Sequence, residues 1–333
     1  MQLDELLKEA KTVAIFGHVR PDGDCVGSTL GLYNYICDNY PTIRVRIYLE
    51  RFPESYKILP RSNEIIEIFG EDDKKRFQSN YFDDCDSCDL AILLDTPSFE
   101  RVGANGEKCL KAAKKTCNID HHISNPLNLC TINFVEAKAS SASEVLYFLL
   151  DNDKISKEAA ECFYLGIVHD TGAFKFSSTG QKTMVAIGNL LDKGIDFTRL
   201  MNETYFTRTY IQTLVTGYVM MSCKLALDGK VVYSYMTPED MDRYSVTPVE
   251  LSNVIDTLRE VSGTEVAIFL YPINGEYKIS LRSNYVVDVN KIASNFGGGG
   301  HVRAAGGSSK ESPEDTIKKL LLLIQQQLSK QRF

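Results

Sequence analysis

The sequence contains no tryptophan, only five histidines among 333 residues, and no long hydrophobic run. No stretch reaches the roughly 18 apolar residues that a membrane span requires, and the opening MQLDELLKEA has no apolar core of the kind found in a signal peptide. Basic residues are not in excess either, since 37 Lys and Arg stand against 44 Asp and Glu, for a net charge of -7. These absences argue against a membrane protein and against one that coats long nucleic acid through a basic surface. They predict a cytoplasmic protein.

Paired cysteines are scarce as well. The nine cysteines are scattered and odd in number, which predicts reduced thiols rather than a disulfide framework. Cys85 and Cys88 have the C-x-x-C spacing of a zinc or redox pair, but a closed zinc site needs four ligands and no second pair lies nearby. We therefore expect most of the cysteines to be small buried residues.

What the chain does contain is a repeated pattern of apolar runs and helical segments. The runs TVAIF (12–16), RVRIYL (44–49), LAILLD (90–95) and TCNID (116–120) are separated by helical patterns, the first from about Val26 to Tyr40. Near-continuous apolar strands between helices are typical of a parallel sheet that is covered on both faces. The predicted fold class is α/β, with a doubly wound, mostly parallel sheet.

The second half of the sequence predicts a smaller mixed α/β domain. Helical spacing and serine caps predict helices over 143–151 and 156–168, and a further helix is expected over 210–221. Hairpins are predicted at Asp228-Gly229 and at Asn274-Gly275, and an amphipathic helix over 314–328. With 333 residues, two domains are expected, over 1–190 and 207–333, joined by a linker over 191–206 with a cleft between them.

Polar groups gather where the predicted strands end. Functional groups in a parallel sheet collect beyond the carboxyl ends of the strands. The loop GHVRPDGDCVGS (17–28) follows the first strand, and further acidic and imidazole groups close later segments. The candidate residues are His18, Asp22, Asp24, Asp95, Asp120, His121, His122 and Asp170.

This mixture of carboxylates and imidazoles predicts a divalent-cation site. A lone Asp-Gly-Asp is more often a turn that satisfies its own backbone hydrogen bonds, but the coincidence of so many groups at strand ends favours metal. The donor set favours Mn²⁺, with Mg²⁺ or Co²⁺ as alternatives, over a closed zinc site. The set exceeds the needs of one ion, and two ions need a shared carboxylate, for which Asp95 is the natural bridge.

A second polar region lies near the C-terminal end of the sequence. Gly297, Gly298, Gly299 and Gly300 precede His301 and Arg303, and ISLRS adds Arg282 from the end of a predicted strand. A glycine run is commonly only a flexible loop. Here it permits close approach of backbone amides to an anion, and arginine binds phosphate through a planar fork, so phosphate capture is the favoured interpretation.

The motifs together resemble a known family. GHVRPDGDCVGS, LLDT, NIDHH and HDTGAF occur in the order and approximate spacing of the DHH phosphoesterases, and ISLRS and FGGGGHVRAAGG resemble the DHH-associated substrate domain. The combination is similar to the branch of bifunctional oligoribonucleases and pAp phosphatases, also called nanoRNases. The resemblance spans nearly the whole chain.

The resemblance implies a role for each matched residue. His18, Asp22 and Asp95 would hold one metal ion, and Asp24, Asp95, His121 and Asp170 the other. Asp120 would orient its neighbours, and His122 would touch the phosphate and is one candidate for protonating the leaving oxygen, the other being a water molecule on the metal. Substrate would be bound by Arg282, Ser283, Gly299, His301 and Arg303. His169 does not belong to the motif and is expected to be peripheral.

The implied activity is metal-dependent hydrolysis of short 5'-phosphorylated oligoribonucleotides such as pApA to mononucleotides, together with dephosphorylation of adenosine 3',5'-bisphosphate (pAp), a 3'(2'),5'-bisphosphate nucleotidase activity. A soluble inorganic pyrophosphatase of the same superfamily is the alternative, disfavoured by the glycine-rich motif. A non-catalytic nucleotide-binding module would have lost metal ligands, and none is lost. A homodimer is compatible with the sequence, which does not fix the oligomeric state.

Overall fold

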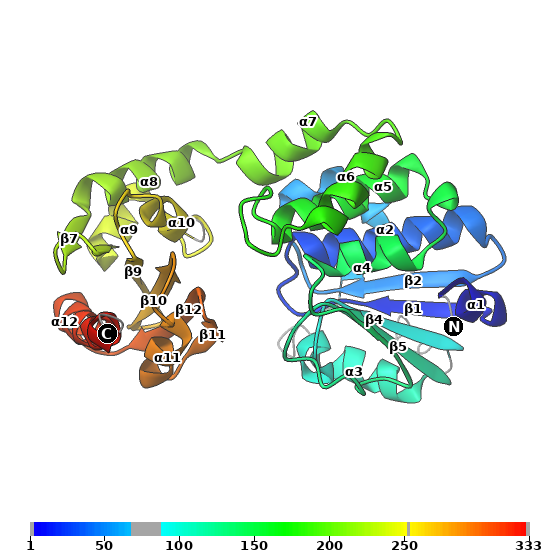
Figure 1. The fold of residues 1–333 in the computed structure, drawn as a ribbon, viewed down its shortest axis with the longest axis horizontal. Helices are drawn as coiled ribbons and strands as arrows, with labels where there is room; N and C mark the ends of the chain where they lie inside the picture. Colours follow the sequence, from blue (N-terminus) through cyan, green and yellow to red (C-terminus); the bar gives the residue numbers. More distant parts are fainter. Residues whose placement is uncertain (1–2, 68–87, 252–253, 331–333) are drawn as a thin grey trace. The chain divides into compact units, whose positions relative to one another are not determined.

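A computed structural model describes residues 3–67, 88–251 and 254–330 of the chain (Figure 1). It consists of two compact units, Met1–Thr207 and Arg208–Phe333, each built around one six-stranded sheet. The predicted α/β class is confirmed. Among the described residues, no helix combines the length and the apolar character needed to cross a bilayer.

The sheet of the first unit is parallel throughout, in the order β3-β2-β1-β4-β5-β6. Ile15 in the middle of β1 pairs with Ile47 of β2 and with Ile92 of β4. The strands are β1 (Thr12–Phe16), β2 (Arg44–Leu49), β3 (Ile65–Glu67), β4 (Leu90–Leu94), β5 (Lys115–Asp120) and β6 (Ile132–Val135).

Helices cover both faces of this sheet, as the apolar runs predict. In β1, Val13 and Ile15 join the core under α2, α4, α5 and α6, whereas Ala14 and Phe16 pack on the opposite side with α3 (Figure 1). The helices are α1 (Leu3–Glu9), α2 (Gly23–Asn39), α3 (Gly103–Ala112), α4 (Ala142–Leu149), α5 (Lys157–Asp170), α6 (Gln181–Leu191) and α7 (Phe197–Leu200). Short turns are η1 (Glu54–Ile58), η2 (Ser62–Glu64), η5 (Phe99–Val102), η6 (Asn152–Lys154) and the π-helix η7 (Met201–Phe206).

The start of α2 differs from the sequence expectation. α2 begins at Gly23 rather than Val26 because Asp22 caps it, accepting hydrogen bonds from the amides of Asp24 at 3.2 Å and Cys25 at 3.1 Å. The predicted serine caps are present, with Ser141 before α4 and Ser156 before α5.

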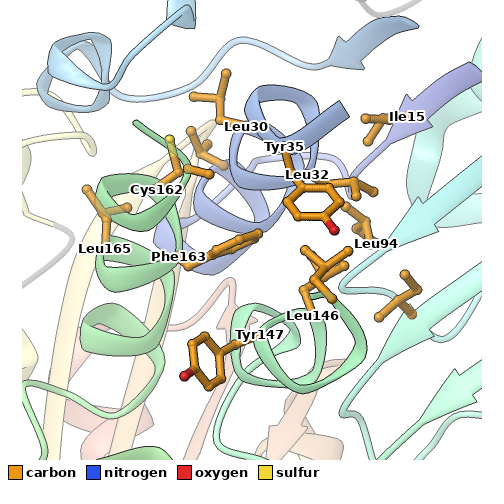
Figure 2. Packing of buried hydrophobic residues seen from close by; sticks show 14 of the residues in the cluster. Ile15, Leu30, Leu32, Tyr35, Leu94, Leu146, Tyr147, Cys162, Phe163 and Leu165 are labelled. Carbon is orange, nitrogen blue, oxygen red and sulfur yellow. The ribbon is translucent and has the colours of Figure 1, made fainter. Parts of the chain in front are cut away.

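α2 and α5 pack against each other more closely than ordinary side chains permit. A Cβ atom on Gly27 would lie 2.6 Å from the carbonyl oxygen of Cys162 and 2.7 Å from the amide nitrogen of Gly166. Figure 2 shows buried residues of this region, among them Leu30 and Tyr35 of α2 and Phe163 of α5, which belong to one hydrophobic cluster. The close contact brings the first turn of α2 near the end of α5, where Asp170 lies.

The second unit contains a mixed sheet in the order β11-β12-β10-β9-β8-β7, in which only the β8–β9 pair is parallel. Both predicted hairpins are confirmed, between β7 and β8 and between β9 and β10. The strands are β7 (Lys224–Ala226), β8 (Val231–Tyr235), β9 (Val266–Ile273), β10 (Glu276–Ser283), β11 (Gly299–His301) and β12 (Ala304–Ser309). The α-helices are α8 (Tyr210–Ser222), α9 (Pro238–Tyr244), α10 (Val254–Arg259), α11 (Val289–Ala293) and α12 (Pro313–Lys330). A short 3-10 helix, η8 (Ser294–Phe296), follows α11.

Residues 191–206, for which the sequence predicts a linker, contain α7 and η7 in the structure. Leu200 is buried in the core of the first unit, and Met201 and Tyr205 pack against it. These contacts place residues 191–206 in the first unit. The metal-binding role expected of residues 1–190 and the substrate-binding role expected of residues 207–333 stay predictions. Of the C-x-x-C pair, Cys85 lies outside the described residues and Cys88 is buried.

Candidate functional site

Three neighbouring strands carry the candidate residues at their carboxyl ends. β1, β4 and β5 are adjacent in the sheet, and they lead into His18, Asp95 and Asp120 respectively. Asp170 reaches the same place from α5, which ends at that residue. The structure thus brings together side chains that are far apart in the sequence, at the edge where parallel sheets place their sites.

The first donor group is centred on His18. Its Nε2 lies 3.6 Å from Asp22 Oδ1 and 3.4 Å from Asp95 Oδ2. Nδ1 donates to the carbonyl oxygen of Val19 at 2.9 Å, which leaves Nε2 facing the carboxylates. Burial by itself lowers the pKa of His18, but Cys25 and the two carboxylates raise it well above its ordinary value.

The second donor group consists of Asp24, His121 and Asp170, whose ligand atoms all lie within 4.8 Å of one another. His121 Nε2 is 3.0 Å from Asp170 Oδ2 and 3.4 Å from Asp95 Oδ1. Burial and the nearby Asp95 charge raise the pKa of Asp170 to about 6. Burial, with the carboxylates of Asp95 and Asp170, also raises the pKa of Asp24 well above its usual value. Crowded carboxylates of this kind are relieved by cations.

Asp95 lies between the two groups, with Oδ2 toward His18 and Oδ1 toward His121. Its side chain is only 3% exposed, and Oδ1 is buried without a hydrogen-bond partner among the described residues. Its backbone adopts φ +54°, an uncommon conformation for a non-glycine residue that is found at functional sites. A buried anionic oxygen without a donor fits a divalent cation, so the donor set fits the metal ions that the sequence predicts.

Both carboxylate oxygens of Asp120 accept hydrogen bonds from neighbouring groups of the protein. Fully buried, it accepts hydrogen bonds from the amides of His121 and His122 at 2.8 and 3.2 Å, and lies 2.7 Å from His122 Nδ1. Its other oxygen accepts from Asn125 Nδ2 at 2.6 Å, and the same nitrogen contacts Asn118 Oδ1 at 2.7 Å. The predicted orienting role of Asp120 fits these contacts. The sequence analysis missed Asn118 and Asn125, because no charge or spacing distinguishes them from ordinary loop asparagines.

The amino terminus of α4 holds Asp24 in place. Oδ2 accepts from the amide of Ala142 at 2.6 Å and Oδ1 from the amide of Ser143 at 3.0 Å. Buried Glu144 fixes this turn, since its Oε2 accepts from the Ser140 hydroxyl at 2.6 Å and from Thr183 of α6 at 2.7 Å. The donors to Asp24 are backbone amides, which almost any residue can supply, so the sequence contains no motif that would reveal them.

Two further residues border the donor groups. A sulfur atom joins the first group, because the ligand atoms of His18, Cys25 and Asp95 lie within 4.8 Å of one another. His169 packs against Gly23, where a Cβ atom would lie 2.2 Å from its ring, and its nitrogens lie 3.3 Å from Tyr56 Oη and 3.5 Å from Thr204 Oγ1. Both nitrogens of His169 thus have partners outside the two donor groups, and its peripheral role stays a prediction.

In the second unit, several predicted substrate residues already have partners. Arg282 Nε donates to Asp256 at 2.9 Å. Buried Ser283 donates to Glu265 at 3.1 Å and accepts from Arg303 Nη1 at 3.1 Å. The hydroxyl of Ser283 therefore supports Arg303 from within the protein, and the substrate contact expected of Ser283 stays a prediction.

The second half of the glycine run, Gly299 and Gly300, lies in β11, which pairs with β12. The amides of Gly298 and Gly300 donate to the carbonyl of Ala293 at 3.1 Å and to Asn290 Oδ1 at 2.8 Å, and the anion-binding role expected of the glycine run stays a prediction. A Cβ atom on Gly298 would lie 1.9 Å from the Gly306 carbonyl, so close strand packing requires glycine there. His301 is exposed at the end of β11.

Comparison with known protein families identifies both halves of the chain. The DHH family N-terminal domain matches residues 12–167, and the DHHA1 domain matches residues 228–330. The chain belongs to the DHH/DHHA1 phosphoesterases. Members of this family are divalent-metal-dependent hydrolases, which agrees with the His and Asp cluster at the strand ends.

This DHH phosphoesterase is similar over most of its length to characterised relatives. It is 28% identical over 295 residues to the bifunctional oligoribonuclease and PAP phosphatase NrnA of Bacillus subtilis, with 87% of each chain covered. It is 29% identical over 304 residues to the probable bifunctional oligoribonuclease and PAP phosphatase NrnA of Streptococcus mutans, with 89% of this chain and 88% of that one covered.

A solved structure supports the same relationship. The crystal structure of an exopolyphosphatase-related protein from Bacteroides fragilis superposes with a TM-score of 0.88 at 27% identity, covering 97% of this DHH phosphoesterase and 94% of that chain.

Proposed function

We propose that this phosphoesterase hydrolyses short 5'-phosphorylated oligoribonucleotides, dinucleotides such as pApA above all, to mononucleotides and removes the 3'-phosphate of pAp. The observation that carries the proposal is Asp95, whose two carboxylate oxygens face two separate groups of metal donors. The similarity to the NrnA proteins supports the choice of these substrates within the family.

Two divalent cations, with Mn²⁺ as the favoured ion, would be held by the two donor groups. His18, Asp22 and Asp95 form one set, and Asp24, His121 and Asp170, with Asp95 shared, form the other. Cations at such sites supply a nucleophile at neutral pH and neutralise the charge of the phosphate oxygens. The chain itself then needs no covalent nucleophile.

His122 is the residue of this chain best placed to act on the phosphate ester. Asp120 lies 2.7 Å from its Nδ1 and fixes the orientation of the ring. His122 Nδ1 also lies 3.7 Å from Asp95 Oδ1, which places the imidazole beside the second donor group. An imidazole held there can bind the phosphate and return a proton to the departing sugar oxygen.

Arg303 is the main phosphate-binding residue proposed in the second unit. Nη1 is held by Ser283 Oγ and by the carbonyl of Val287, whereas Nε and Nη2 have no hydrogen-bond partner in the described part of the chain. A guanidinium with one fixed nitrogen and a free edge suits bidentate contact with a phosphate. Exposed His301 and partly exposed Arg282 are the further cationic candidates.

One product analysis tests this proposal. pApA, an RNA pentanucleotide, pAp and inorganic pyrophosphate are each incubated with the enzyme and Mn²⁺, and the products are separated by chromatography. We expect AMP from pApA and from pAp, with slower turnover of the pentanucleotide. Turnover of pyrophosphate alone would overturn the proposal in favour of a pyrophosphatase.

A further inference from the structure

The loop that follows β10 has an unusually well-fixed backbone. Glu265, only 5% exposed, accepts four hydrogen bonds on Oε1, from the Ser283 hydroxyl at 3.1 Å and from the amides of Tyr285, Val286 and Val287 at 3.3, 2.7 and 2.8 Å. Asn284 adds two bonds through Nδ2, to the carbonyls of Arg259 and Thr264 at 3.2 and 3.0 Å. The loop is therefore held in one conformation before any ligand binds.

The same loop holds the side chain of Arg303, which lies between β11 and β12. Its Nη1 donates to Ser283 Oγ at 3.1 Å and to the carbonyl of Val287 at 3.0 Å, so both ends of the loop grip the guanidinium. Ser283 donates in turn to the carboxylate that holds the amide of Tyr285. The Ser283–Glu265 pair thus holds both the guanidinium of Arg303, the proposed phosphate-binding group, and the backbone of Tyr285.

The side chain of Tyr285 is open to solvent on this rigid loop. It is 74% exposed, and exposed apolar surface continues on Val286 and on Val302, the residue before Arg303, which are 44% and 49% exposed. The amide of Val289 donates to the carbonyl of Val302 at 3.0 Å, which ties the Arg303 hairpin to the end of the loop. A loop tip needs no aromatic residue for its own stability, because the polar network beneath it already fixes the backbone.

We propose that Tyr285 stacks against the base of the nucleotide whose phosphate Arg303 binds. This inference rests on the proposed function and adds to it a base-binding group that distinguishes nucleotides from other phosphoesters. Aromatic rings stack on any base, and a ring on a preordered loop loses little entropy when the base binds. We therefore expect the enzyme to prefer phosphoesters that carry a base, whichever base that is.

The test compares two substrates in steady-state kinetics with Mn²⁺. One is pAp, and the other is the abasic 1-deoxyribose 3,5-bisphosphate, which keeps both phosphates and lacks the base. For Tyr285→Ala we expect KM for pAp to rise about tenfold with kcat unchanged, because stacking contributes on the order of a factor of ten per base. KM for the abasic compound should not change, and Tyr285→Phe should restore the wild-type KM for pAp.

Tyr210→Ala is the matched control, since Tyr210 of α8 is 77% exposed in the same unit and lies outside this loop. It should leave both KM values unchanged. An equal rise in KM for both substrates in Tyr285→Ala, or no rise for either, overturns the stacking role while wild-type turnover of pAp upholds the proposed function. Absence of pAp turnover by the wild-type enzyme overturns the proposed function and this inference together.

Discussion

At the scale of single residues, the site depends on carboxylates that the protein places together in spite of their repulsion. Asp24 and Asp170 have raised pKa values because they are buried near Asp95. Partial relief comes from the imidazoles and from the α4 amides that hold Asp24. Asp95 Oδ1, by contrast, receives no hydrogen bond from the described residues.

Replacement of Asp95 tests its role as the shared ligand. Asp95→Asn keeps the shape and removes the charge that faces both donor groups, so we expect activity to fall by more than the roughly 10–100-fold typical of residues that only support a ligand. The rise in melting temperature that Mn²⁺ gives the wild type through binding to the native state should also disappear. Activity and thermal unfolding with and without Mn²⁺ measure both effects.

The metal-free Asp95→Asn variant should unfold close to the metal-free wild type, because the substitution removes a charge from a crowded carboxylate site. Asp153→Asn, at an exposed turn, is the control and should keep the full Mn²⁺ response. A variant that retains wild-type turnover and metal stabilisation would show that Asp95 is not shared between two ions.

Replacement of Asn125 tests the support that its side-chain amide gives to Asp120. Asn125→Ala removes the 2.6 Å donor to Asp120, which loosens the residue that fixes His121 and His122. We expect Mn²⁺ affinity or activity to fall about 10–100-fold, as for other groups behind metal ligands. Isothermal titration with Mn²⁺ measures the affinity. Asn189→Ala removes a comparable bond, to Tyr147 Oη, outside the site, and a loss of equal size there would show that the effect is general destabilisation.

The sequence was informative about residues whose chemistry is distinctive, and silent about those that act through common groups. Every predicted metal ligand lies at the strand-end cluster, because charged side chains directly after apolar strands are costly to bury unless a cation or a hydrogen-bond network compensates them. Asn125 and the amides of Ala142 and Ser143 carry no such signal. The hydrogen bond between Ser283 and Glu265, 18 positions earlier, carries no such signal either, because the sheet brings the two residues together.

At the scale of elements, the site is assembled by the close packing of α2 on α5. Asp24 lies in the first turn of α2 and Asp170 at the last residue of α5, so the distance between the helices determines whether the two carboxylates share the second donor group. Gly27 and Gly166 permit this approach. Gly166 also leaves room for Asp24 itself, since a Cβ atom there would lie 2.7 Å from Asp24 Oδ1.

A methyl group at Gly27 should push these helices apart. We expect Gly27→Ala to destabilise the protein by about 1–3 kcal/mol, the usual cost of overpacking, and to weaken Mn²⁺ binding, because Asp24 and Asp170 separate. Gly188→Ala in α6 is the matched control, because nothing lies within 4 Å of its added Cβ. That change should be neutral or stabilise by about 0.5–1 kcal/mol. Urea unfolding and Mn²⁺ titration distinguish the outcomes, and equal behaviour of the two variants would contradict the packing argument.

Elements with strong apolar runs were predictable, whereas weakly patterned ones were not. β1, β2, β4 and β5 follow the apolar segments almost residue for residue. β11 and β12 were missed because GGH and AAGGSS have little β propensity, and their pairing is made possible by glycines that let two backbones approach. The π-helix η7 has no sequence pattern that separates it from a loop.

At the scale of the whole molecule, the charge distribution bears on substrate length. The net charge is -7, and both arginines considered for substrate binding also have partners within the second unit, Arg282 with Asp256 and Arg303, through Nη1 alone, with Ser283 and Val287. Long single strands are bound through many phosphate contacts along a basic track. With these two arginines as the proposed phosphate-binding cations, the protein is expected to contact one or two phosphates through its side chains.

The salt dependence of turnover measures that number. At a fixed Mn²⁺ concentration, the logarithm of kcat/KM for pApA should fall with the logarithm of KCl concentration with a slope of about -0.7 to -1.4, because each of one or two phosphate contacts on a single strand contributes roughly -0.7. Arg303→Gln should lower kcat/KM and make the slope less steep by about 0.7, since it removes one such contact. A wild-type slope steeper than about -4, or a kcat/KM that grows steadily with RNA length, would instead require an extended basic track and would contradict the preference for short substrates.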